Sequence, residues 1–228
     1  MTPYESALTK KLTQAIELNS RLTGWVKGDD NDFPPEAPVL QTVIQRIETT
    51  NRQLDEQWHR YWELCEQRRQ LAYESEGAIK PLNEQLWTDI GYQFKGGTVA
   101  NDLLKVLYLK IHRLPLPRFP ANRRKPVHYK DLRVHEDSYA LLGQYFSWLI
   151  DLLQIVDFMP LTSAYCLAAF REQARQFNMM TQEVTQEAEK LRNMQLTQSH
   201  LYKQLNQVMT AARGRLLVYK RETKQEVK

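Results

Sequence analysis

The feature that most constrains the fold is the stretch from Tyr139 to Met159, YALLGQYFSWLIDLLQIVDFM, the longest apolar run in the chain. About 14 large apolar side chains lie in it, and at about 1.5–3 kcal/mol each their burial represents on the order of 20–40 kcal/mol. This exceeds the net stability of a typical domain, so a soluble chain must bury the segment. The polar residues of the run recur every three or four positions and form one thin stripe on a helix: Gln144, Ser147, Asp151, Gln154 and Asp157.

Three ways of burying this helix remain open from the sequence. It can be the central helix of a bundle, which is our leading interpretation, or it can form a contact between subunits. It can also enter a bilayer, because about 20 residues are long enough to span one. Two aspartates are costly in hydrocarbon, so this third arrangement requires the polar stripe to face water, as in an oligomeric pore.

Composition favours a soluble helical protein. The 228 residues are 42% hydrophobic and 25% charged, with a mild net charge of +4. The eight glycines and ten prolines cluster, which leaves long uninterrupted segments for helices. The two cysteines, Cys65 and Cys166, lie far apart and do not indicate a disulfide framework. Because the N-terminus lacks the apolar segment of a signal peptide, we expect a cytoplasmic protein.

The N-terminal part predicts two helices joined by a turn-rich loop. The first covers Thr2 to about Leu22, with Thr2 and Pro3 as start signals. The second runs from Pro38 to about Tyr73 and carries four heptads. Asn51 at a core position either fixes the register against a partner or simply faces a polar group. The heptad positions are Leu40, Ile44, Ile47, Asn51, Leu54, Trp58, Tyr61 and Cys65.

Two shorter helices are expected next, over Pro81–Phe94 and Val99–His112. Between them stands the sequence KGGT, which ends at Thr98. A Gly-Gly turn before a helix can cradle an anion, although the spacing of a Walker motif is missing. We interpret it instead as a plain loop in which Thr98 caps the following helix.

The region from Arg113 to Arg133 is predicted to be irregular, because four prolines fall between Pro115 and Pro126. Positive charge is concentrated in it. This loop is either a solvated crossover or a docking site for an acidic partner, phosphates or lipid head groups. The candidate contacts for an acidic partner or phosphate are Arg113, Arg118, Arg123, Arg124, Lys125, Lys130 and Arg133.

The C-terminal part, from about Leu161 onward, carries the most regular heptad of the chain, reaching Tyr219. It predicts either one helix of about 60 residues, roughly 90 Å long, or a hairpin broken near Leu196–His200. Its apolar seam is a candidate helix interface formed by Leu167, Phe170, Phe177, Val184, Leu191, Tyr202, Leu205 and Met209.

Motifs for catalysis or metal binding are missing from the sequence. The acidic run at Asp29–Asp32 lacks the remaining positions of a calcium loop. The pair Glu56 and His59 is not repeated as a di-metal site requires. Glu136 and Asp137, beside His135, are expected at the start of the central helix, where acids favour the helix dipole. We therefore assign no catalytic, cofactor-binding or metal-binding residues, and expect neither a cofactor nor enzymatic activity.

Together these patterns predict an all-α protein, an elongated and mostly antiparallel helical bundle with long, coiled-coil-like helices. Residues 1–112 form the N-terminal helices, 113–135 the basic crossover loop, and 136–228 the central and C-terminal helices of one continuous domain. The leading functional hypothesis is a non-enzymatic structural or interaction protein. It self-associates or binds a protein partner through its heptad faces. Two alternatives stay open, a membrane-active protein of the pore-forming kind that inserts residues 139–170, and nucleic-acid or anion binding through residues 113–133.

Overall fold

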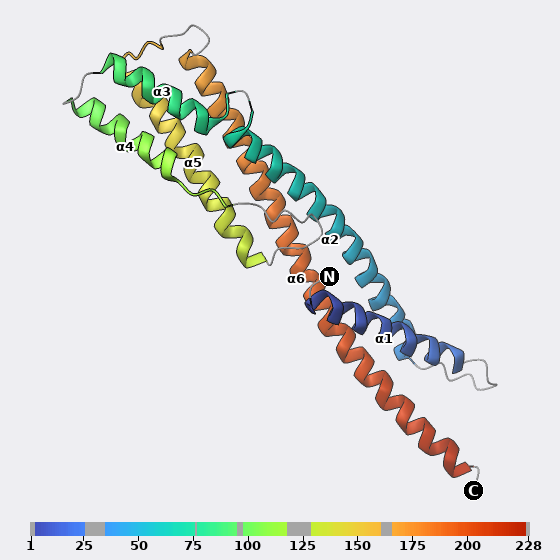
Figure 1. The fold of residues 1–228 in the computed structure, drawn as a ribbon. Helices are drawn as coiled ribbons and strands as arrows, with labels where there is room; N and C mark the ends of the chain where they lie inside the picture. The colour runs from blue at the N-terminus through green and yellow to red at the C-terminus, as the bar shows by residue number, and fades with distance from the viewer. Residues whose placement is uncertain are drawn as a thin grey trace. The chain divides into compact units, whose positions relative to one another are not determined.

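The computed structural model describes residues 3–25, 35–75, 77–94, 98–117, 129–160 and 166–226. These residues form helices and their connections, with no strand among them, so the prediction of an all-α protein is confirmed (Figure 1). The helices are α1 (Pro3–Trp25), α2 (Glu36–Tyr73), α3 (Ile79–Gln93), α4 (Val99–Arg113), α5 (Tyr129–Ile155) and α6 (Leu167–Glu226).

The chain divides into two compact units by its internal contacts. Unit 1 contains residues 1–57 and 191–228, and unit 2 contains residues 58–190. The long helices α2 and α6 contribute residues to both units. Each unit has its own cluster of buried apolar side chains.

Unit 1 is built from α1, the first part of α2 and the second part of α6. Arg215 donates to Glu36 at 3.1 Å, and Gln198 donates to Asn51 at 2.8 Å. Because residue numbers rise along α2 as they fall along α6, the two helices run antiparallel. Their apolar seams meet side chains of α1, including Ala15 and Leu22, in the buried core of this unit.

The heptad predicted for α2 is confirmed by burial. All seven apolar members, from Leu40 to Cys65, are buried. Asn51 is partly exposed and accepts the hydrogen bond from Gln198 described above. The helix begins two residues before the predicted start at Pro38, which its first turn accommodates because the nitrogen of proline needs no hydrogen-bond partner there.

Unit 2 packs α3, α4 and α5 with the adjoining parts of α2 and α6. The predicted cap of α4 is confirmed, because the Thr98 hydroxyl accepts a hydrogen bond from the Asn101 N–H at 3.2 Å. At the other end of α4, Lys80 of α3 donates to the carbonyls of Ile111, His112 and Leu114 at 2.5, 3.0 and 3.0 Å. This cation satisfies acceptors that the end of a helix leaves open.

The central apolar run lies on α5, whose bounds differ from the prediction at both ends. The helix begins at Tyr129, within the region predicted to be irregular, and it ends at Ile155. Asp157 then takes a left-handed backbone with a φ of 49°. Of the polar stripe, Gln144, Asp151, Gln154 and Asp157 are exposed and Ser147 is partly buried, so the stripe faces outward.

Helix α6 is one uninterrupted helix of 60 residues. The break considered near Leu196–His200 does not occur, because the polar residues there lie within regular helical backbone. Helix α1 likewise continues beyond its predicted end at about Leu22, through Gly24 to Trp25.

Candidate functional site

The basic region predicted to bind an acidic partner is only partly described. Arg113 is the last residue of α4 and is exposed. Lys130 and Arg133 lie on the first turns of α5, but their side chains are outside the described residues. Arg118, Arg123, Arg124 and Lys125 are also outside the described residues. The prediction that this region binds an anion therefore stays a prediction.

The candidate helix interface on α6 lies inside the protein's own two cores. Three members are buried in unit 2: Phe170, Phe177 and Val184. Leu167 is partly buried against the core of that unit. Leu191 is buried at the point where α6 passes into unit 1. Tyr202, Leu205 and Met209 are buried in unit 1. In this arrangement these side chains already pack against the chain's own helices, so a partner needs other surfaces.

Arg68 and Glu136 form an ion pair inside unit 2. One guanidinium nitrogen of Arg68 lies 2.5 Å from Oε2 of Glu136, and the second donates to Oε1 at 3.2 Å. Tyr61 donates to the same carboxylate at 3.1 Å, and Thr185 donates to it at 3.3 Å. The guanidinium carbon also lies 3.9 Å from the centre of the Tyr139 ring. This buried network ties α2, α5 and α6 together.

Its ionisable side chains are poorly suited to catalysis. Arg68 is 0% exposed and Glu136 is 7% exposed, so a dissolved substrate does not reach them. Burial raises the pKa of the Cys65 thiol to about 12 and also raises the pKa of the Tyr61 phenol. A thiol protonated at neutral pH is a weak nucleophile. The arrangement instead specifies one packing of the helices, a role that buried polar networks can have.

Sequence reasoning missed this network, although one signal for it was present. Arg68 follows Cys65 by three positions and Tyr61 by seven, so it continues the core seam of α2. Extending the heptad by one step predicts a buried arginine, which requires a buried acid. Glu136 was instead expected at the start of a helix, but α5 begins seven residues earlier and Glu136 lies in its interior.

An exposed apolar face follows α4 and α5 in unit 2. Three side chains of α5 spaced by seven residues are 38%, 46% and 76% exposed: Leu141, Trp148 and Ile155. Leu103 and Val106 of α4 are 50% and 49% exposed. Between the two groups lie Tyr145 and Leu152, which are partly buried against the core. We call these seven side chains the α4–α5 face.

Contacts between the helices fix how the two halves of this face line up. Lys110 of α4 lies over the Tyr145 ring of α5, 4.9 Å from its centre. The two helices pack together and run antiparallel in Figure 1. Moving seven residues back along α4 and seven forward along α5 therefore brings Leu103 level with Leu152. The α4–α5 face is accordingly one continuous surface across two helices.

A polar groove borders the α4–α5 face on the side of α6. Its cavity volume is about 600 Å³, and Trp148 forms one wall. Thr181 lines it, and its buried hydroxyl has no hydrogen-bond partner within the described residues. The other lining residues are mostly amides and hydroxyls, among them Gln144, Ser147, Asn178, Gln182, Thr185 and Gln186. An apolar patch with a polar border has the anatomy of a protein interface.

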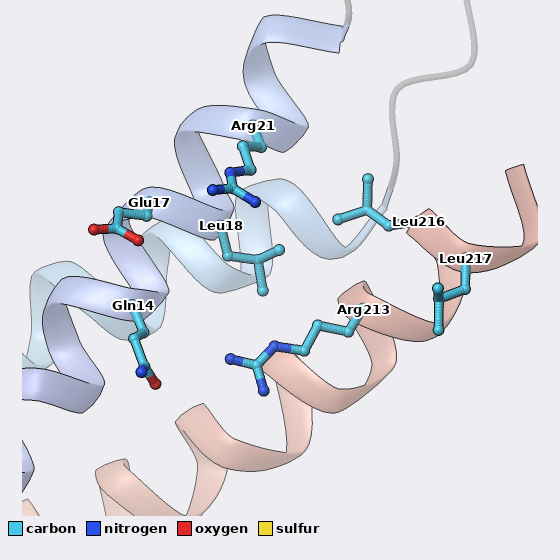
Figure 2. Close-up of a pocket in the computed structure, with 7 residues that line it drawn as sticks. All are labelled: Gln14, Glu17, Leu18, Arg21, Arg213, Leu216 and Leu217. Atoms are coloured by element: carbon cyan, nitrogen blue, oxygen red, sulfur yellow. The ribbon is translucent and has the colours of Figure 1, made fainter. Parts of the chain in front are cut away.

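A second groove lies in unit 1 between α1 and α6, and its volume is about 390 Å³ (Figure 2). Helix α1 contributes Gln14, Glu17, Leu18 and Arg21. Helix α6 contributes Arg213, Leu216 and Leu217. Figure 2 shows the two arginines on either side of Leu18, which forms the floor between them.

Two kinds of site are absent from the part of the chain that the structure describes. There, no group of three or more His, Cys, Asp or Glu side chains is arranged to hold a metal ion. Within the same residues, no helix combines the length and apolarity needed to cross a bilayer.

No family model, curated protein or solved structure matches the chain.

Proposed function

We propose that this chain is a non-enzymatic helical interaction protein that self-associates through the α4–α5 face. The observation that carries the proposal is the exposure of Leu141, Trp148 and Ile155 along one line of α5. Contiguous exposed apolar surface is uncommon on monomers and marks interaction sites. A half-exposed tryptophan surrounded by aliphatic side chains is the typical centre of such an interface.

The spacing of these side chains favours a second copy of the chain as the partner. In a twofold dimer the same patch is used by both subunits. Leu141 and Ile155 stand seven residues before and after Trp148. When two α5 helices pack antiparallel, Trp148 therefore meets its equivalent, and Leu141 meets the second copy's Ile155.

The first test is the absolute mass in solution, measured by light scattering over a range of concentrations. We expect a dimer of about twice the 26.9 kDa chain mass. Trp148→Glu is expected to weaken dimerisation by roughly thirtyfold or more, because it removes an interface anchor. Leu196→Glu is the matched control, since Leu196 is 49% exposed on α6 outside the α4–α5 face. A wild-type monomer at all concentrations overturns self-association.

The orientation is tested by disulfide trapping in a Cys166→Ser background, because Cys166 is exposed and Cys65 is buried. Leu141→Cys mixed with Ile155→Cys is expected to give a cross-linked heterodimer on mild oxidation, whereas neither variant alone does. Cross-linking of each variant with itself contradicts antiparallel packing. A dimer unaffected by Trp148→Glu shows that another surface carries the association.

A further inference from the structure

We infer that the groove between α1 and α6 in unit 1 binds an oxyanionic ligand, a molecule with carboxylate or phosphate groups on an apolar body. The site is separate from the α4–α5 face, because its lining residues all belong to unit 1. The inference therefore does not depend on the proposed self-association.

The first support is the unbalanced charge of the lining. Two guanidinium groups, those of Arg21 and Arg213, stand against one carboxylate, that of Glu17, which leaves a net charge of +1. No hydrogen bond or ion pair joins either arginine to a described residue.

The second support is the position of the two arginines. They come from different helices and border one groove (Figure 2). Guanidinium groups bind carboxylates and phosphates through paired, charge-assisted hydrogen bonds. The amide of Gln14 lies in the same groove and adds a further hydrogen-bond donor.

The floor of the groove determines what the anionic groups are attached to. Leu18 and Leu216 both line the groove, and Leu18 is 7% exposed while Leu216 is partly buried. An apolar body over this floor removes hydrocarbon surface from water. The fitting ligand thus places oxyanions at the arginines and hydrocarbon at the leucines.

The experiment uses two probes, inorganic phosphate and adipate, whose two carboxylates are joined by an aliphatic chain. Each is titrated into the full-length protein while sodium chloride keeps the ionic strength constant. The readouts are the Nε–Hε signals of Arg21 and Arg213 in ¹⁵N NMR spectra and the thermal midpoint. We expect saturable shifts of both arginine signals with at least one probe. Shifts with phosphate alone identify a phosphate site, and tighter binding of adipate identifies a carboxylate site.

Three variants and one control isolate the groove. Arg21→Gln and Arg213→Gln are each expected to weaken binding by about tenfold, because each removes one charge-assisted contact. Glu17→Gln is expected to tighten binding, because it removes the nearby negative charge. Arg46→Gln is the control, since Arg46 is exposed on α2 and does not line the groove. The inference is overturned by the absence of saturable shifts, or by equal binding in the Arg21→Gln and Arg46→Gln variants.

Discussion

At the scale of single residues, the buried pair of Arg68 and Glu136 leads to a prediction about stability. Glu136→Gln leaves the fully buried guanidinium without a counter-charge, so we expect the free energy of unfolding to fall by about 3–5 kcal/mol. Arg68→Met leaves the carboxylate unpaired, with a similar loss. The double variant Arg68→Met with Glu136→Gln is expected to lose less than the two single losses combined. Urea denaturation measures all four proteins, and strictly additive losses contradict coupling through the ion pair.

Gly143 gives a second prediction at this scale. A methyl group added there lies 2.1 Å from Oδ1 of Asn178, whose amide donates to Ser147 at 3.2 Å. Gly143→Ala must displace the exposed Asn178 side chain and its hydrogen bond to Ser147, and we expect this variant to be less stable than Gly91→Ala by about 1 kcal/mol. Gly91→Ala is the matched control, because that helical glycine has nothing within 4 Å of the added carbon. It is expected to stabilise by about 0.5–1 kcal/mol. Equal thermal midpoints of the two variants contradict the steric argument.

At the scale of helices, α3 secures the end of α4 through Lys80. Its ammonium group donates to three carbonyls at the last turn of α4, and burial lowers the pKa of this lysine. Lys80→Met removes these charge-assisted bonds, and we expect a cost of about 1.5–3 kcal/mol. Hydrogen exchange is expected to accelerate over the last turn of α4, while Lys105→Met, on an exposed position of α4, leaves exchange there unchanged. Unchanged protection in the Lys80→Met variant rules out this role.

Helix types were predictable because they depend on local spacing. The alternation of three and four residues from Leu40 to Cys65 was enough to predict α2 and its buried side. The start of α5 was missed by seven residues, because the irregular region inferred from the prolines up to Pro126 was extended to residue 135, although Tyr129–Arg133 contains no helix breaker. The continuity of α6 was left open, because glutamines at core positions weaken the pattern without interrupting the backbone.

The sequence did not predict which face of each helix is exposed to solvent. Helix α5 is apolar nearly all round, so its own pattern does not distinguish Phe146, which is buried, from Trp148, which is half exposed. The pairing of Arg68 with Glu136 spans 68 positions, and no local rule connects residues that distant. The groove of Arg21 and Arg213 likewise needs the three-dimensional arrangement, because its residues come from opposite ends of the chain.

At the scale of the whole molecule, the buried ionisable groups predict a loss of stability in alkali. Burial raises the pKa of Cys65 from 9.0 to about 12 and that of Tyr139 from 10.0 to about 12. The unfolded chain therefore ionises these groups at lower pH than the folded chain, and ionisation favours unfolding. The contribution of these two groups to the free energy of unfolding is expected to be fully present below about pH 9. It is lost as the pH rises toward 12. At pH 10.5 the share of Cys65 is on the order of 2 kcal/mol.

Urea midpoints at pH 8 and pH 10.5 measure this loss. Cys65→Ala is expected to show a smaller fall between the two pH values than the wild type, because the titrating thiol is gone. An equal fall in both proteins shows that Cys65 does not titrate as its burial implies.

The difference in exposure between the two cysteines allows thiol modification to report transient opening of the core. Cys166 is exposed and Cys65 is buried, so a thiol reagent at neutral pH modifies Cys166 directly but reaches Cys65 only when the core of unit 2 opens. In a Cys166→Ser background, the rate of modification divided by that of an unfolded peptide thiol gives the open fraction when reclosing is fast. The modification rate of this one thiol can thus show how far a ligand or a second subunit suppresses the opening of the core around Cys65.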